Sequence, residues 1–188
     1  RGRHMGELRG DHALGGHYRS GARAGGQGRG DQHDGHLLGL RGGRPEHPIT
    51  RALHSAAGLG PDYALLHERL AAADLHLASL APATDAELDA FAYRSHGALQ
   101  QLAAQALAGS RSDELMTLGA HLGRGVALTE IVREVRREAL AGTLRLPLER
   151  LEGAGLEPEA LQGASLPQAL ASVIEPLVAR AREALAAA

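Results

Sequence analysis

Apolar residues recur every three or four positions from Leu65 onward, and this periodicity limits the possible folds more than any other feature of the sequence. No segment alternates polar and apolar residues in the manner of a half-buried strand. Gly, Pro, Ser and Thr interrupt the periodic segments, as they do at helix boundaries. We therefore predict an all-α fold, built as a bundle of antiparallel helices.

The interruptions divide the periodic region into individual helices. We predict a short helix from Pro48 to near Gly58 and a long one from Pro61 to just before Pro82. A third helix follows a capping box at Thr84 and ends at Gly109, and a fourth is capped by Ser112. An extended connector at 144–148 leads to a short helical turn, and a last helix runs from Pro167 towards Ala187. Pro176 should kink or break the last helix. The glycines of the helix after Ser112 cost about 1 kcal/mol each relative to Ala unless close packing needs them; they are Gly119, Gly123 and Gly125.

The N-terminal residues differ in composition from the rest. Fourteen of the 25 glycines lie within residues 1–45, together with many Arg and His and few large apolar residues. Such a segment cannot bury enough surface to offset its backbone entropy, so we expect it to be largely disordered. The predicted organisation is a Gly/Arg/His-rich segment at 1–44 and a helical domain at 45–188.

Composition excludes several classes of function. The 188 residues include no Cys and four aromatic residues, and the formal net charge is −2. Disulfide frameworks and thiol nucleophiles are therefore excluded, and base-stacking or basic nucleic-acid binding is disfavoured. No apolar run approaches the roughly 20 residues of a transmembrane helix. We expect a soluble cytoplasmic protein, with peripheral membrane association left open, and no nucleic-acid partner.

Three carboxylates recur on one face of the helix after Ser112, at Glu130, Glu134 and Glu138. Their i, i+4, i+8 spacing would let oxygen ligands hold Mg²⁺ and present it to a diphosphate. Neighbouring arginines, Arg133 among them, would then either pair with the carboxylates or contact phosphate. The alternative is a solvated helix face with intrahelical ion pairs.

Four segments match family motifs in one order. Residues 43–53 resemble G-x-P-x-H-P-V…A-L, residues 85–97 resemble D-E-L…Y-C-Y-x-x-A-G, residues 122–138 resemble L-G-x-A-x-Q-L-T-N-I-L-R-D-V-x-E-D, and residues 142–148 resemble G-R-x-Y-L-P-L. These are motifs of the squalene/phytoene synthase family, and the resemblance covers roughly residues 43–188.

The resemblance implies an all-α fold of the isoprenoid-synthase type. Active members of that family join two prenyl diphosphates head to head, using Mg²⁺ held by two aspartate-rich motifs on opposed helices. The resemblance makes Mg²⁺ the expected cofactor if the chain is active, and a prenyl diphosphate the expected ligand. The candidate residues are Glu130, Glu134 and Glu138 for Mg²⁺ and Arg133 and Tyr93 for substrate.

The chain departs from the family pattern at the diphosphate site. Glu134 and Glu138 stand where the second motif has Asp, Arg137 stands at its intervening Glu, and Glu130 at its Asn; Thr143 and Arg145 then replace an Arg and a Tyr. We expect Arg137 to compete for the carboxylates. No first aspartate-rich motif precedes Gly43, and the family has further helices beyond the point where this chain stops, so we expect an incomplete bundle.

Three interpretations remain open, and the first is favoured. The chain is a degenerate or truncated member without full catalytic competence, an active prenyltransferase with a Glu-based metal site, or a member whose residues 1–42 come from a shifted reading frame. A helical interaction or assembly protein outside the family is a further alternative. Uncovered apolar helix faces would favour self-association.

Overall fold

The computed structural model describes residues 44, 46–48, 50–52 and 62–188; helices joined by loops make up this part of the chain, with no strand in it. The helices are α3 (Tyr63–Ala78), α4 (Asp85–Ala92), the π-helix η1 (Tyr93–Gly97), α5 (Ala98–Ala108), α6 (Asp113–Ala141), α7 (Leu148–Gly153), the 3₁₀-helix η2 (Pro158–Gln162) and α8 (Leu170–Ala186). The all-α prediction is confirmed. Of the short helix predicted from Pro48, residues 48 and 50–52 are helical, and the rest lies outside the described residues.

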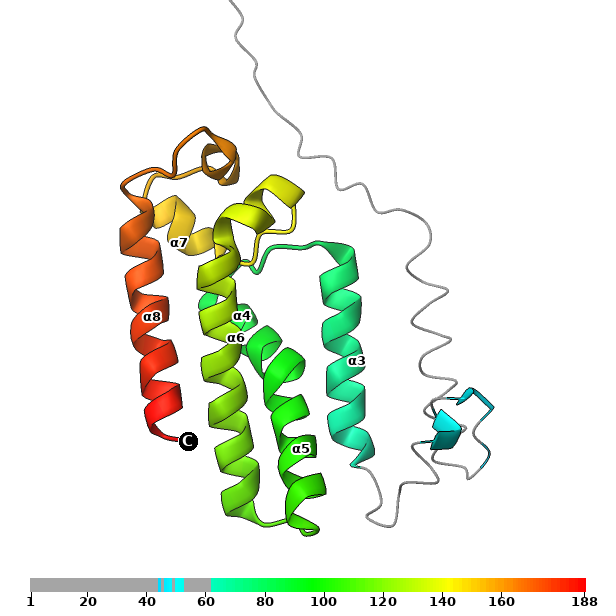
Figure 1. The fold of residues 1–188 in the computed structure, drawn as a ribbon. Helices are drawn as coiled ribbons and strands as arrows, with labels where there is room; N and C mark the ends of the chain where they lie inside the picture. Colours follow the sequence, from blue (N-terminus) through cyan, green and yellow to red (C-terminus); the bar gives the residue numbers. More distant parts are fainter. Residues whose placement is uncertain (1–43, 45, 49, 53–61) are drawn as a thin grey trace, which may run out of the picture.

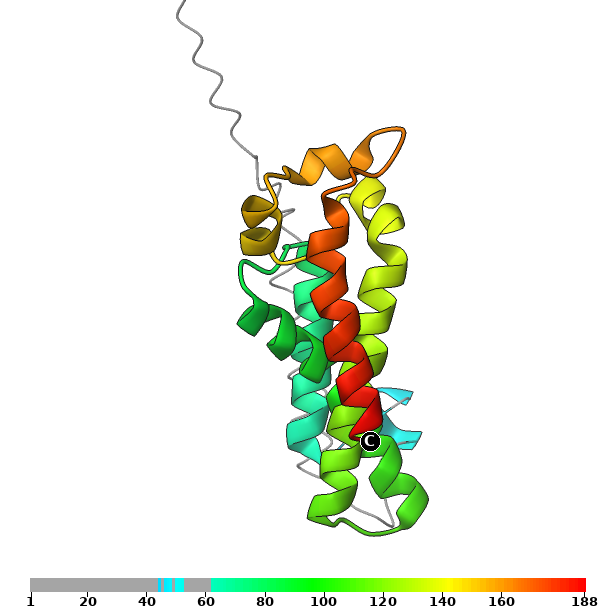
Figure 2. The same cartoon turned by 90° about the vertical axis from the view of Figure 1, so that its left-hand side faces the viewer.

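The long helix α6 is the centre of the bundle (Figure 1). It packs against α8 on one side and against α5 on the other, and α3 packs on η1 and α5. Figure 2 shows α8 lying along the bundle, with α7 and η2 at the end opposite the α5–α6 turn. The described part of the chain is therefore a bundle in which α6 contacts most other elements.

Thr84, Gly109 and Ser112 mark helix boundaries as the sequence predicts, because these capping residues adopt the expected geometry. The hydroxyl of Thr84 accepts from the Glu87 N–H at 3.2 Å, and the Glu87 carboxylate accepts from the Ala83 N–H at 2.7 Å. Ser112 caps α6 in the same way, and Gly109 and Gly142 end α5 and α6 in the left-handed conformation, with φ of 67° and 69°.

Two predicted boundaries need correction. Asp62 is the N-cap of α3, with its carboxylate accepting from the N–H groups of Ala64 and Leu65, so the helix begins at Tyr63 rather than Pro61. The last helix begins at Leu170, after a tighter turn from Pro167 to Ala169. It runs through Pro176 without a break, contrary to the alternative of a broken helix.

The core lies mainly between α6, α8 and the segment that follows α6. Its fully buried side chains are Leu88, Leu128, Ile131, Leu146, Leu151, Leu161, Val173 and Leu177. These are aliphatic residues, as the low aromatic content requires. Burial of each such side chain contributes about 1.5–3 kcal/mol.

Gly119 and Gly123 of α6 are needed for close packing, which offsets their cost in helix propensity. A Cβ on Gly123 would lie 2.5 Å from the backbone of Gly97 and His96, and one on Gly119 would lie 2.8 Å from the backbone N of Gln101. These residues let η1 and α5 approach α6 backbone to backbone. No described helix is long and apolar enough to cross a membrane.

Candidate functional site

The three candidate carboxylates of α6 are each bonded to a different cationic or ionisable group. Glu134 lies between two arginines of its own helix, with Arg133 Nε at 2.9 Å and Arg137 Nε at 2.5 Å. The hydrogen bonds from Arg137 and then Arg133 hold the pKa of Glu134 below its usual range. The expected competition from Arg137 is therefore present.

Glu138 is the buried member of the set, with 4% of its side chain exposed. Its Oε1 accepts a hydrogen bond from Nη2 of Arg145, which follows the turn after α6. The second carboxylate oxygen and Nε of Arg145 are buried without a partner in the described part of the chain. The Arg145 guanidinium also lies 5.6 Å from the centre of the Phe91 ring, within the range of a cation–π contact.

Glu130 is bonded to His96 of η1, with 3.1 Å between its Oε2 and Nε2 of the imidazole. On the other side of the ring, Nδ1 lies 3.0 Å from the hydroxyl oxygen of Ser95. Burial lowers the pKa of His96, and the nearby Glu130 opposes that shift. Both ring nitrogens therefore have polar partners, and the histidine joins η1 to α6.

As arranged, these residues do not fit the Mg²⁺ ion that the family resemblance implies. The described residues contain no group of three His, Cys, Asp or Glu side chains that could hold a metal ion. A divalent ion at Glu134 would have to displace two guanidinium groups, and one at Glu138 would have to enter a buried salt bridge.

The two candidate substrate residues have local partners. Tyr93, the first residue of η1, is 37% exposed, and its hydroxyl lies 3.2 Å from Oε1 of Gln101. Partial burial raises the pKa of its phenol. The side chain of Arg133 is 70% exposed and bonded to Glu134. Tyr93 and Arg133 form no hydrogen bond with each other in the described structure.

A second group of charges joins α4 to three other elements. Asp85 pairs with Arg150 of α7 at 2.5 Å and with Arg180 of α8 at 3.0 Å. Asp89 pairs with Arg180 as well, and with Arg124 of α6 at 2.9 Å. The hydrogen bond from Arg150 is the main cause that lowers the pKa of Asp85. The group holds α8 and α7 against α4.

The pKa of Asp85 is lower in the folded state, so its carboxylate stabilises the fold at pH values above the ordinary aspartate pKa. This contribution is lost as the pH falls through the pKa of the folded state. Asp85→Asn is expected to lower the free energy of unfolding at pH 7 by about 1.5 kcal/mol, the lower end of the range for a hydrogen bond to a charged group, because 33% of the side chain is exposed. Urea denaturation at pH 7 and at pH 3 measures the difference, which should shrink at the lower pH. Asp74→Asn on the exposed face of α3 is the control, and a pH-independent difference would contradict the prediction.

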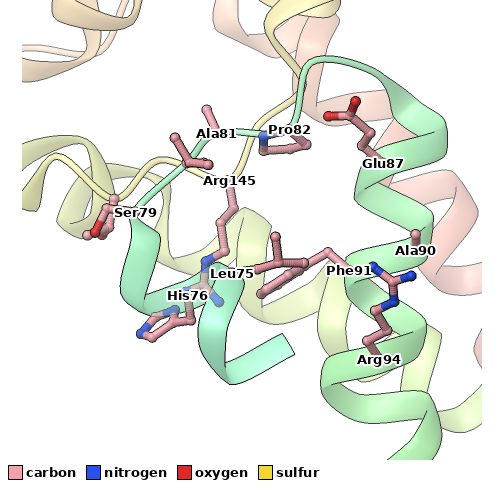
Figure 3. A pocket seen from close by; sticks show the side chains of 12 residues that line it. Leu75, His76, Ser79, Ala81, Pro82, Glu87, Ala90, Phe91, Arg94 and Arg145 are labelled. Atoms are coloured by element: carbon pink, nitrogen blue, oxygen red, sulfur yellow. The ribbon is translucent and has the colours of Figure 1, made fainter. Parts of the chain in front are cut away.

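A cavity of about 310 Å³ opens between the C-terminal end of α3, the loop before α4, α4 itself and the segment after α6. Figure 3 shows Leu75 and Phe91 in its interior, with Arg145 and Arg94 reaching towards it from different elements. The remaining lining residues are His76, Ser79, Leu80, Ala81, Pro82, Glu87, Ala90 and Thr143. None of the three α6 glutamates lines it.

The described residues form a helical bundle around the long, glutamate-bearing helix α6. The sequence profile of squalene/phytoene synthases matches residues 18–188. The chain belongs to the squalene/phytoene synthase family.

Individual relatives agree with this family. A presqualene diphosphate synthase from Rhodopseudomonas palustris is 35% identical over 104 residues, which are 55% of this chain and 37% of that protein. The squalene synthase HpnC from Alicyclobacillus acidocaldarius superposes with a TM-score of 0.76 at 17% identity, over 86% of this chain and 61% of that one. A dehydrosqualene synthase crystallised with a ligand superposes with a TM-score of 0.73 at 22% identity, over 86% of this chain and 57% of that one. The chain spans less than two thirds of the length of each.

Sequence reasoning foresaw the arginines beside Glu134 but missed the partners of Glu130 and Glu138. The spacing of Glu130, Glu134 and Glu138 identified their common helix, but His96 and Arg145 come from other elements. The one available signal was the departure at Arg145, which stands where the family pattern has Tyr. Nothing in the spacing of Asp85 and Asp89 indicated the arginines that they meet.

Proposed function

We propose that this chain is a squalene/phytoene-synthase-like protein of the isoprenoid biosynthesis type, with impaired catalysis and a helical domain at residues 45–188. The observation that carries the proposal is the pairing of each α6 glutamate with a cationic or ionisable group of the chain itself. A prenyl diphosphate is the proposed ligand class, by likeness to the family.

The energetics of these pairs support the loss of metal-dependent chemistry. A catalytic Mg²⁺ needs carboxylate oxygens free to coordinate it and open positions for the substrate phosphates. Glu138 is buried against Arg145, and separating such a pair leaves an uncompensated charge in a low-dielectric region. Glu134 is accessible but holds two guanidinium groups. Glu134 and Glu138 are therefore proposed to be neutralised by arginines of the chain itself.

The purified chain is expected to release no pyrophosphate from farnesyl or geranylgeranyl diphosphate when Mg²⁺ is added. A coupled pyrophosphate assay measures this, with the presqualene diphosphate synthase from Rhodopseudomonas palustris as the positive control for assay and substrates. Mg²⁺-dependent release that is lost in Glu134→Ala would instead establish the alternative, an active prenyltransferase with a Glu-based metal site.

A non-catalytic interaction or assembly role is the second candidate, and exposed leucines favour it. Among the residues that the structure describes, four leucines are more than half exposed: Leu77, Leu80, Leu107 and Leu140. Leu77 and Leu80 lie close together at the end of α3, where Leu75 is also partly exposed. Such a cluster is typical of a surface that another apolar surface covers.

Self-association through the end of α3 is the corresponding prediction. Sedimentation velocity of the wild-type chain is expected to show a concentration-dependent dimer, and Leu77→Glu should shift it to monomer by placing a charge in the contact. Leu107→Glu, at the far end of α5, is the control and should leave the dimer intact. A wild-type chain that stays monomeric at every concentration would refute the prediction.

A further inference from the structure

The ion pair between Glu138 and Arg145 is more enclosed than the carboxylate–arginine pairs at Glu134, Asp85 and Asp89. Its two side chains are 4% and 18% exposed, whereas those three carboxylates are 21%, 33% and 37% exposed. Charges that are removed from water interact strongly, and they are costly to leave without a partner. Glu138 is therefore the carboxylate of α6 that depends most on its cation.

Arg145 connects three parts of the bundle through one guanidinium group. It belongs to the segment after α6, where its neighbours Leu144 and Leu146 are 7% and 0% exposed. Its Nη2 donates to Glu138 in the last turn of α6, and the guanidinium lies 5.6 Å from the centre of the Phe91 ring of α4 (Figure 3). The cation thus ties the segment after α6 to both helices, as a bound ion ties the chain segments that coordinate it.

The positive charge of Arg145, rather than a lack of acceptor atoms, keeps a divalent ion away from Glu138. Mg²⁺ binds proteins through one or two carboxylates together with several waters. Oε2 of Glu138 is buried and has no partner in the described structure, so the carboxylate retains an unused acceptor. A divalent ion on that oxygen would lie beside a guanidinium group in an enclosed region, where like charges repel strongly.

The arginines at Glu134 form a weaker barrier to an ion. The side chains of Arg133 and Arg137 are 70% and 74% exposed, and exposed ion pairs contribute little because water solvates the separated charges. These two arginines can turn into water at small cost, in contrast to the enclosed Arg145. The exclusion of an ion therefore depends mainly on one residue.

We propose that Arg145 is a resident cation that stands in for a divalent ion at Glu138. It fixes the segment after α6, and it excludes divalent ions from the buried carboxylate. The proposal rests on the neutralisation of Glu134 and Glu138 proposed above and deepens it, because it assigns the exclusion of metal to a single positioning residue. The exclusion should therefore end when the guanidinium group is removed.

Electron paramagnetic resonance of Mn²⁺ tests the proposal, because the signal of the free ion falls when the ion binds protein. Arg145→Gln is expected to bind Mn²⁺ at least about tenfold more tightly than the wild type, since Glu138 then lacks its cation and the adjoining cavity admits water ligands. The double variant Arg145→Gln with Glu138→Gln should lose this gain. Arg137→Gln removes an exposed arginine of α6 and is the matched control, with the affinity of the wild type.

Thermal unfolding gives a second readout, which does not require the variant to be stable without metal. An ion that binds only the folded chain raises the unfolding midpoint, by about 3–6 °C at roughly ten times its dissociation constant for a chain of this length. Arg145→Gln should show this rise with Mn²⁺, and the wild type and Arg137→Gln should not. Arg145→Lys keeps a cation near Glu138 and should exclude Mn²⁺ as the wild type does.

Several outcomes would overturn the proposal. One is Mn²⁺ binding that is as tight in the wild type, in Arg137→Gln or in Arg145→Lys as in Arg145→Gln. A gain in affinity that survives Glu138→Gln would also overturn it, and so would an Arg145→Gln variant that folds without any gain in affinity or stays unfolded when Mn²⁺ is present.

These outcomes are distinct from a failure of the proposed function. Mg²⁺-dependent pyrophosphate release by the wild type would refute impaired catalysis but leave the Mn²⁺ comparison between variants unchanged. Absence of the gain in Arg145→Gln would refute the role of Arg145 but leave the pyrophosphate result unchanged.

Discussion

Replacing Arg145 by Met is expected to lower the free energy of unfolding by about 3 kcal/mol, because Glu138 is left buried without its cation. The carboxylate is 4% exposed and its second oxygen already lacks a partner in the described structure. Urea denaturation followed by the helical circular dichroism signal measures the loss.

The double variant Glu138→Leu with Arg145→Met should recover most of that loss, since removing both charges also removes their desolvation penalty. Arg137→Met is the matched control: its ion pair with Glu134 is at the surface, with 74% of the arginine side chain exposed, and it should change stability little. If the double variant is as unstable as Arg145→Met alone, the orphaned charge is not the cause.

Gly123→Ala is expected to destabilise the protein by about 2 kcal/mol, although Ala favours a helix by about 1 kcal/mol over Gly. The new Cβ would lie 2.5 Å from three backbone atoms of Gly97 and His96. Backbone cannot move aside as the end of a flexible side chain can, so η1 would be pushed away from α6. Thermal or urea denaturation measures the change.

Gly153→Ala in α7 is the control for this substitution, because nothing lies within 4 Å of its added Cβ. It should leave stability unchanged or raise it by about 0.5 kcal/mol through helix propensity and a less flexible unfolded chain. Equal effects at both positions would show that backbone contact at Gly123 does not limit the packing.

Local sequence signals were sufficient for most of the fold. Thr84 and Ser112 mark helix starts because their hydroxyls accept from backbone groups three residues ahead, and Gly109 marks an end because it adopts positive φ. These effects depend on neighbours in the chain. The π-helix was not predicted, because Tyr93–Gly97 continues the apolar stripe of its neighbours.

The candidate site could be predicted only in part, because its charges are balanced across elements. Glu134 and Arg137 are neighbours on one helix, so their competition was foreseeable from spacing. The contact between Glu130 and His96 joins residues 34 positions apart, and depends on how η1 crosses α6. No periodicity within one helix carries that information.

The π-helix also determines the rotation of α4 relative to the helix that follows. In η1 the N–H of Ala98 bonds the carbonyl of Tyr93, five residues back, so the turn holds one residue more than an α-turn. Deleting one residue there would restore an α-helix and turn α4 by about 100° relative to α5. Asp85 and Asp89 would then leave the side that meets Arg180. The ion pairs between α4 and α8 therefore depend on a single extra residue in η1, which belongs to neither helix.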